Sequence, residues 1–222
     1  MKILGIDSST DRLSIGLCCD GNIISDKSID SLREHGSRIM GLIDSVLREG
    51  QLEVNALDGL AVAIGPGSFT GLRVGMAAAK GLTRVLGIPI VGIYTFEVIA
   101  RRVLKEFDEF VLVEQARKGE FYYCPISGES DIFSKMRLVA ADNLKDASGN
   151  LPLGLIGVAA VWPIDSDQTI ISEKTQVSGG ELAILGEERI LGDKIDDLAK
   201  LEPLYIAPSQ AEIKFGKNRI SN

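Results

Sequence analysis

The chain is poor in the side chains that most often carry metal and redox chemistry. Its 222 residues include one histidine, His35, and three cysteines, Cys18, Cys19 and Cys124. The cysteines are odd in number and have no CxxC spacing, so they indicate neither a disulfide framework nor a zinc site. We therefore expect reduced core cysteines in a cytoplasmic protein.

Long apolar runs and an excess of positive charge are also lacking. The longest apolar run, residues 151–164, contains Pro152 and Pro163 and is shorter than the roughly 18 residues that a membrane span needs. The first residues reach a charge too early for a signal peptide. A formal net charge of -7 works against a broad contact with nucleic acid. We expect no membrane segment, and any contact with nucleic acid should need a partner.

The hydrophobic content of 45% supports a sizeable core, in one domain or two closely joined halves. Apolar runs predict strands at residues 2–6, 13–19 and 22–26, with Asp20-Gly21 as a hairpin turn. A helix that ends near Gly50 is followed by a strand at 60–64, a helix at 72–86 and a strand at 90–93. This order, βββαβαβ, is similar to the ribonuclease-H-like half-unit of the actin, sugar-kinase and Hsp70 superfamily.

The second half of the sequence resembles a reduced copy of the same unit. We expect its elements in the following order: strands at 110–114 and 120–125, a helix at 142–147, a buried strand at 155–161 and a helix at 180–190. The join falls near residues 105–108. The sequence thus predicts an N-terminal subdomain at 1–104, a C-terminal subdomain at 105–207 and a mobile tail at 208–222.

A glycine-punctuated loop connects the strand at 60–64 to the alanine-rich helix. Residues 65–75 read GPGSFTGLRVG, and Ser68 or Thr70 can cap the helix that follows. The start of a helix attracts anions. The loop is neither a Walker A motif nor a dinucleotide fingerprint, because it has no Gly-Lys-Ser/Thr ending and its third glycine is one residue late. Generic nucleotide-binding motifs therefore do not describe it.

As a whole string, residues 65–75 resemble the GPGSFTGLRxG segment of the TsaB (YeaZ) family, the non-catalytic partner in bacterial synthesis of threonylcarbamoyladenosine on tRNA. Four further segments are similar to that family: residues 6–10, 34–37, 115–122 and 202–207. Gln115 stands where the family has an aspartate, and Ala207 where it has an arginine. The resemblance covers about residues 1–207.

The resemblance implies an actin-like (ASKHA) α/β fold of two ribonuclease-H-like subdomains, the second one reduced. It also implies a TsaD-type partner and a TsaE-type ATPase, with tRNA reached only through the complex and a homodimer when the chain is alone. TsaD holds a metal with a His-x-x-x-His motif, and Thr95 and Ile99 stand at those two positions here. Neither is a good metal ligand. We expect no catalytic residue, no metal site and no peptidase activity.

The family resemblance further implies that the two helices of the first half form a bundle with the same pair from a partner. Gly71, Gly75 and Ala79 repeat at i, i+4 and i+8, which permits close helix approach. An alternative is that this stripe packs on the chain's own first helix or sheet. The predicted interface comprises small and apolar residues of both helices: Ile39, Leu42, Ile43, Val46, Gly71, Leu72, Gly75, Met76, Ala78, Ala79 and Leu82.

No intrinsic cofactor is expected, but ATP or ADP is a candidate ligand where the two partners meet. The candidate nucleotide or phosphate ligands lie in the first turn and the glycine loop: Asp7, Ser8, Gly65, Gly67, Ser68, Thr70 and Arg73. Two simpler roles are that Asp7 caps the turn at 8–10 and that Arg73 pairs with an acid. Two other functions stay open, a small-molecule kinase and a nucleotide-sensing module. The kinase would need a second phosphate loop, and residues 115–119 supply one glycine and no acid.

Overall fold

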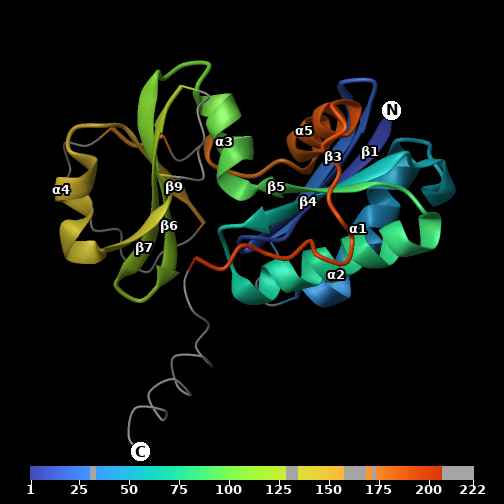
Figure 1. Ribbon diagram of the computed structural model, residues 1–222, viewed down its shortest axis with the longest axis horizontal. Helices are drawn as coiled ribbons and strands as arrows, with labels where there is room; N and C mark the ends of the chain where they lie inside the picture. Colours follow the sequence, from blue (N-terminus) through green and yellow to red (C-terminus); the bar gives the residue numbers. More distant parts are fainter. Residues whose placement is uncertain (31–33, 129–134, 158–168, 172–173, 207–222) are drawn as a thin grey trace, which may run out of the picture.

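The computed structural model describes residues 1–30, 34–128, 135–157, 169–171 and 174–206, which form two sheets side by side (Figure 1). The first sheet has the strand order β3-β2-β1-β4-β5, in which β1, β4 and β5 run parallel and the β1–β2 and β2–β3 pairs are antiparallel. Its strands are β1 (Lys2–Asp7), β2 (Arg12–Cys19), β3 (Asn22–Asp30), β4 (Gly59–Gly65) and β5 (Ile90–Tyr94). The predicted βββαβαβ order is confirmed, although β3 continues beyond residue 26.

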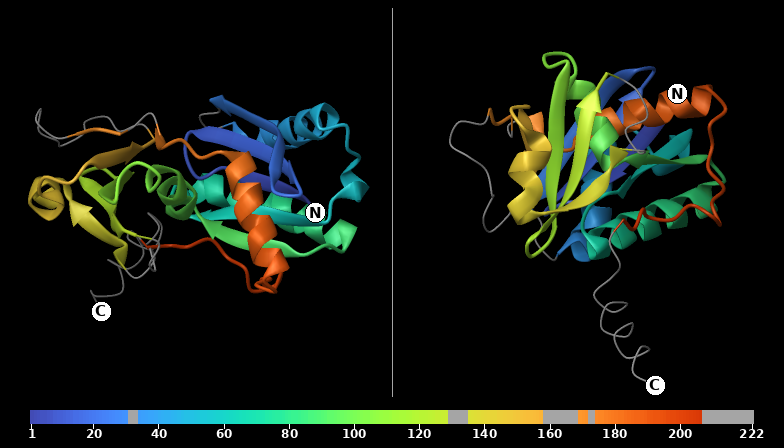
Figure 2. Two further views of the ribbon diagram at one scale, coloured as in Figure 1. Left: turned by 90° about the horizontal axis from the view of Figure 1, so that it is seen from above. Right: turned by 60° about the vertical axis from the view of Figure 1, so that its left-hand side comes forward.

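Helices cover both faces of the first sheet (Figures 1 and 2). On one face lie α1 (His35–Glu49) and α2 (Phe69–Leu86), and on the other lies α5 (Gly179–Leu191). The helix α2 begins three residues earlier than expected, because the Ser68 hydroxyl accepts a hydrogen bond from the Gly71 amide at 3.2 Å. Among the described residues, no helix has both the length and the apolar character to cross a membrane.

The second sheet has the order β8-β7-β6-β9, with β6 and β9 parallel. Its elements are β6 (Glu109–Arg117), β7 (Glu120–Ser127), β8 (Arg137–Ala140), the short helices η3 (Ala141–Asn143) and α4 (Leu144–Ser148), and β9 (Leu153–Ile156). Strand β8 is not predicted from the sequence. The strand expected at 155–161 instead ends at Ile156, because Gly157 takes a left-handed conformation with φ at 72°. Residues 158–161 lie outside the described part.

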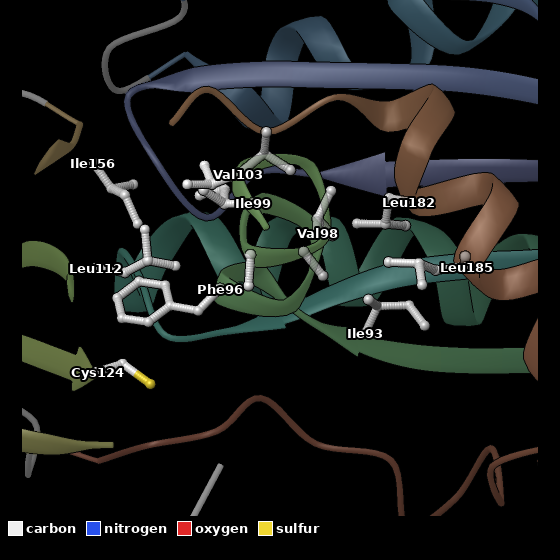
Figure 3. Close-up of a cluster of buried hydrophobic side chains, with 14 of the residues drawn as sticks. Ile93, Phe96, Val98, Ile99, Val103, Leu112, Cys124, Ile156, Leu182 and Leu185 are labelled. Atoms are coloured by element: carbon white, nitrogen blue, oxygen red, sulfur yellow. The ribbon is translucent and has the colours of Figure 1, made fainter. Parts of the chain in front are cut away.

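One hydrophobic core runs through both sheets by way of α3 (Thr95–Val103), a helix that the sequence reading missed. Figure 3 shows Phe96 pointing toward Leu112 and Cys124 of the second sheet, with Val98 on the side of Leu182. The helix α5 comes from the second half of the sequence but packs on the first sheet. The predicted boundary between residues 104 and 105 therefore divides the sequence into two halves, and α5 of the second half packs against strands of the first half.

After α5 the chain returns beside β5 and α2 as a segment that we call the C-terminal strap, residues 193–206 (Figures 1 and 2). The Asp196 amide donates to the Ile90 carbonyl at 3.1 Å, and the Gly92 amide donates to the Asp196 carboxylate at 2.8 Å. Further on, the Leu204 amide donates to the Ile64 carbonyl at 2.7 Å. The strap therefore covers the edge of β5 and ends beside the glycine loop. The tail predicted at 208–222 lies outside the described residues.

Candidate functional site

The glycine loop after β4 packs directly on the turn between β1 and β2. The Ser68 amide donates to the Ser9 carbonyl at 2.6 Å. A Cβ atom on Gly67 would lie under 3.0 Å from Ser9, and one on Gly71 would lie equally close to the Ser8 carbonyl. Real Cβ atoms do not approach other atoms so closely. Glycine is needed here because two stretches of backbone touch.

Several of the predicted phosphate ligands already have partners within the chain. The Ser8 hydroxyl donates to the Gly71 carbonyl at 2.8 Å, and the Ser68 hydroxyl accepts from the Gly71 amide. On the opposite side of the loop, the Leu204 carbonyl would lie 3.4 Å from a Cβ on Gly65. The loop is thus held between the β1–β2 turn and the C-terminal strap. Packing accounts for its glycines, and phosphate binding by Ser8, Gly65, Gly67, Ser68 and Thr70 stays a prediction.

Asp7 ends β1 and is 1% exposed. One carboxylate oxygen accepts a hydrogen bond from the Ser9 amide at 3.1 Å, the local bond expected of an aspartate that caps a turn. Burial raises the pKa of Asp7 to about 6, and the hydrogen bonds with Ser9 act in the opposite direction. Among the described residues, its other oxygen Oδ2 has no hydrogen-bond partner.

A second buried carboxyl group, Glu114 on β6, belongs to the other sheet. Burial raises its pKa well above the ordinary value, and the charges of Asp7 and Asp11 raise it further. Its oxygen Oε2 also has no hydrogen-bond partner in the described part of the chain. The two sheets thus bring like-charged groups near one another. This arrangement favours a bound proton or cation and disfavours a phosphate group.

The sequence reading missed Glu114, although one signal was available. An acid follows directly on the apolar run 110–113, which places it on a buried strand. Its electrostatic partner Asp7 lies on the other sheet, so the pair appears only in three dimensions. Within the described residues, no group of three or more His, Cys, Asp and Glu side chains could hold a metal ion.

Arg73 lies on the exposed side of α2 and contacts two aromatic rings. Its Nε donates to the Tyr205 hydroxyl at 3.0 Å, and its guanidinium carbon lies 4.1 Å from the centre of the Phe69 ring. The two ring centres are 4.9 Å apart, and Phe69 and Tyr205 are 37% and 41% exposed. The signature loop and the segment at 202–206 therefore meet in one cluster, which the sequence analysis did not predict.

The small-residue stripe of α2 faces inward, and this corrects the predicted interface. A Cβ on Gly75 would collide with the Ser8 hydroxyl, and Ala79 is fully buried in the core below the first sheet. The alternative left open by the sequence, packing within the chain, is the one observed. Nine of the named residues are buried in the isolated chain, namely Ile39, Leu42, Ile43, Val46, Gly71, Leu72, Gly75, Met76 and Ala79. Ala78 and Leu82 are half-buried.

The physical reason is that both helices are amphipathic and lie on the sheet. Their apolar faces pack on β1, β2 and β4, so a partner can reach only the opposite faces. On α2 that opposite face is a line of exposed residues spaced four apart, which we call the outward stripe: Phe69, Arg73, Ala77, Gly81 and Val85. On α1, Met40 and Gly41 are exposed as well. The two helices lie next to each other (Figure 1).

Residues 26–157 match the family model described as TsaD: tRNA N6-adenosine threonylcarbamoyltransferase. The tRNA threonylcarbamoyladenosine biosynthesis protein TsaB of Escherichia coli is 33% identical over 132 residues, which are 55% of this chain and 54% of that protein. TsaB of Bacillus subtilis is 33% identical over 123 residues, 55% and 53% of the two chains. The matched region thus spans about half the length of the curated relatives.

Solved structures share the fold over nearly the whole chain. A Pseudomonas aeruginosa protein described as similar to peptidase YEAZ gives a TM-score of 0.74 at 18% identity, covering 93% of this chain and 99% of that one. At this identity the likeness establishes the fold alone, an actin-like α/β fold with ribonuclease-H-like sheets. The family model covers more than half of the chain, and the named relatives are TsaB proteins. The chain therefore belongs to the TsaD-type family that this model describes, and within it to the TsaB proteins.

Proposed function

We propose that this protein is a non-catalytic scaffold in the synthesis of threonylcarbamoyladenosine on tRNA, which docks a TsaD-type protein through the outward faces of α1 and α2. The observation that carries the proposal is the outward stripe of α2. Ala77 and Gly81 are exposed there, although the helix has already buried its apolar face. Small exposed residues in line allow a second helix to approach closely. The TsaB names of the relatives support the pathway.

The proposal assigns the chemistry to the partner. Thr95 and Ile99, which stand at the histidine positions of the TsaD motif, are both fully buried on α3. A hydroxyl and an aliphatic side chain supply no strong ligand for a transition metal. In this proposal a TsaE-type ATPase and tRNA join only through the complex, and the same helix faces form a two-fold homodimer when the chain is alone.

The substitution Gly81→Leu tests the docking face without disturbing the fold. A Cβ at Gly81 meets nothing within 4 Å, and leucine is a better helix former than glycine. A bulky residue at a close helix contact costs about 1 to 3 kcal/mol, so the affinity for the TsaD-type protein should fall roughly 5-fold to over 100-fold. Titration calorimetry measures this change. Gly81→Ala is the matched control, with a far smaller effect.

Unchanged affinity of Gly81→Leu would contradict the docking face. Gly75→Leu is unsuitable for this test, because its side chain would collide with Ser8 inside the chain and lost binding would report a damaged fold. The homodimer is tested with the same variant by sedimentation velocity. We expect Gly81→Leu to shift the purified chain toward monomer. A dimer that survives Gly81→Leu would place the self-association face elsewhere.

A nucleotide at the joint face is a separate part of the proposal. We expect ATP or ADP to bind the complex with the TsaD-type protein and not the isolated chain, because the Ser8 hydroxyl and the Ser68 and Gly71 amides already donate within the chain, so a nucleotide needs further donors from the partner. Calorimetry with ADP on the chain and on the complex measures the difference. ATP turnover by the isolated chain over a panel of small acids and sugars would favour the kinase alternative.

A further inference from the structure

Arg73 differs from most arginines of this acidic chain. The sequence has 31 acidic and 24 basic residues, and six described arginines pair with a carboxylate: Arg38, Arg48, Arg101, Arg102, Arg117 and Arg189. In the part of the chain that the structure describes, no ion pair with a carboxylate involves Arg73. A fixed cation without a counter-charge, in a chain rich in acids, points to an anionic group from outside.

The surroundings of Arg73 hold its guanidinium in place. The group lies 4.1 Å from the centre of the Phe69 ring and 5.7 Å from that of Tyr205, and its Nε is engaged by the Tyr205 hydroxyl. The bond to Tyr205 uses one of five N–H donors, which leaves the donors of the two terminal nitrogens for another acceptor. Tyr205 comes from the strap, so the strap fixes the orientation of this side chain.

The cluster of Phe69, Arg73 and Tyr205 lies at one end of the proposed docking face. Phe69 and Arg73 are the first two members of the outward stripe, one turn before Ala77. Exposed aromatic rings beside an arginine are the composition typical of the residues that dominate binding energy in protein interfaces. An arginine that packs on aromatic rings can bind a carboxylate through two parallel hydrogen bonds, while the aromatic rings exclude water from the contact.

We propose that Phe69, Arg73 and Tyr205 form an anchor site that receives a carboxylate side chain of the TsaD-type partner at the start of α2. The inference rests on the proposed function, because it places the anchor at one end of the same docking face. Arg73 makes the paired hydrogen bonds, Phe69 supports its plane, and Tyr205 sets its orientation. We call these three residues the anchor cluster.

A carboxylate suits the anchor cluster better than a phosphate group. In the neighbouring loop the Ser68 amide and the Gly71 amide already donate within the chain. The net charge of -7 repels a polyanion such as RNA. A single carboxylate needs only the guanidinium and carries less charge than a phosphate.

Arg73→Lys and Arg73→Gln test the anchor in binding to the TsaD-type protein. Lysine keeps the charge but loses the stacking and the paired hydrogen bonds, so we expect both variants to bind at least tenfold more weakly. Tyr205→Phe keeps the ring and removes the orienting hydroxyl, with an expected loss of a few fold. The wild-type affinity should also fall with added NaCl more steeply than that of Arg73→Gln.

Gly81→Leu separates the two proposals. If Gly81→Leu abolishes binding while Arg73→Lys and Arg73→Gln bind as the wild type does, the docking face stands and the anchor is overturned. If none of these variants changes binding, the docking face itself fails. Thermal unfolding checks that each variant is folded. Because Arg73 is exposed, we expect its variants to unfold near the wild-type temperature. Binding of inorganic phosphate or a short single-stranded RNA by the isolated wild-type chain, lost in Arg73→Gln, would overturn the carboxylate assignment.

Discussion

At the scale of single residues, two buried carboxyl groups have pKa values that burial raises above the ordinary range. Asp7 and Glu114 belong to different sheets, and both lack a partner for one oxygen within the described residues. A buried carboxylate without a cation is costly, so each group favours its protonated form. The sequence locates Asp7 at a turn, but its burial comes from the tertiary packing around the end of β1. That packing is not encoded in any local pattern.

We predict that Asp7→Asn removes part of the pH dependence of stability. The pKa of Asp7 is raised from 3.8 to about 6 in the folded chain. Protonation of Asp7 therefore stabilises the folded state, and this stabilisation is fully present below about pH 4 and is lost as the pH rises through 6. At pH 8 the variant should be more stable than the wild type by roughly 1 to 3 kcal/mol, because Asn keeps the acceptor for the Ser9 amide and carries no charge.

Urea unfolding from pH 4 to pH 8 measures this difference between the two proteins. Asp108→Asn, the same substitution at an exposed aspartate, is the matched control. A wild type that gains stability relative to Asp7→Asn as the pH rises would reverse the sign and refute the assignment.

At the scale of elements, α2 has two faces that carry glycines for opposite reasons. Gly71 is pressed against the backbone of the β1–β2 turn, while Gly81 faces open space. Helical periodicity predicts that Gly71, Gly75 and Ala79 share a face. It does not identify the neighbour on that face, because a small side chain permits close approach equally to a partner or to the chain's own backbone.

We predict opposite effects for the same substitution on these two faces. Gly71→Ala forces a methyl group into the Ser8 carbonyl and should lower the free energy of unfolding by about 1 to 3 kcal/mol. Gly81→Ala should raise it by up to about 1 kcal/mol, because alanine favours a helix. Urea titrations followed by circular dichroism compare the two variants. A stable Gly71→Ala protein would show that the β1–β2 turn yields readily.

The elements that the sequence predicts well are those with clear ends. The first hairpin has Asp20-Gly21, and α1 stops at Gly50. The helix α3 escapes prediction because it is packed between two sheets and α5, and its buried residues include Phe96, Val98 and Ile99. Its nine residues span too few turns for the helical period to be clear from the sequence. Strand β8 has only four residues, too few to show a period.

At the scale of the whole molecule, the shared core and the ion pairs between α3 and α5 unite the two sheets. Three pairs link these helices: Arg101–Glu188, Arg102–Glu181 and Glu97–Arg189. The core itself joins Phe96 to residues of both sheets (Figure 3). Sequence order suggests two halves, whereas the return of α5 to the first sheet joins them into one packed unit.

We predict that the two sheets unfold together. Phe96→Ala removes a fully buried ring from the shared core and should cost about 3 to 5 kcal/mol. Because the ring contacts both sides, amides of β1 and β6 should lose hydrogen-exchange protection to the same extent. Val85→Ala, at an exposed position of α2, should leave the hydrogen-exchange protection of β1 and of β6 unchanged. Loss of protection confined to β6 would show that the sheets are separate folding units.

The inward position of the signature glycines has an evolutionary consequence. A larger residue at Gly67 or Gly71 would collide with the backbone of the β1–β2 turn, so we expect these positions to vary little among chains that keep this architecture, whatever those chains bind. Gly81 and its exposed neighbours can change with little penalty in folding. Binding specificity can therefore change on the exposed surface of α2 while the sequence of the glycine loop is retained. Homologues that share this loop sequence are expected to differ in the proteins they bind.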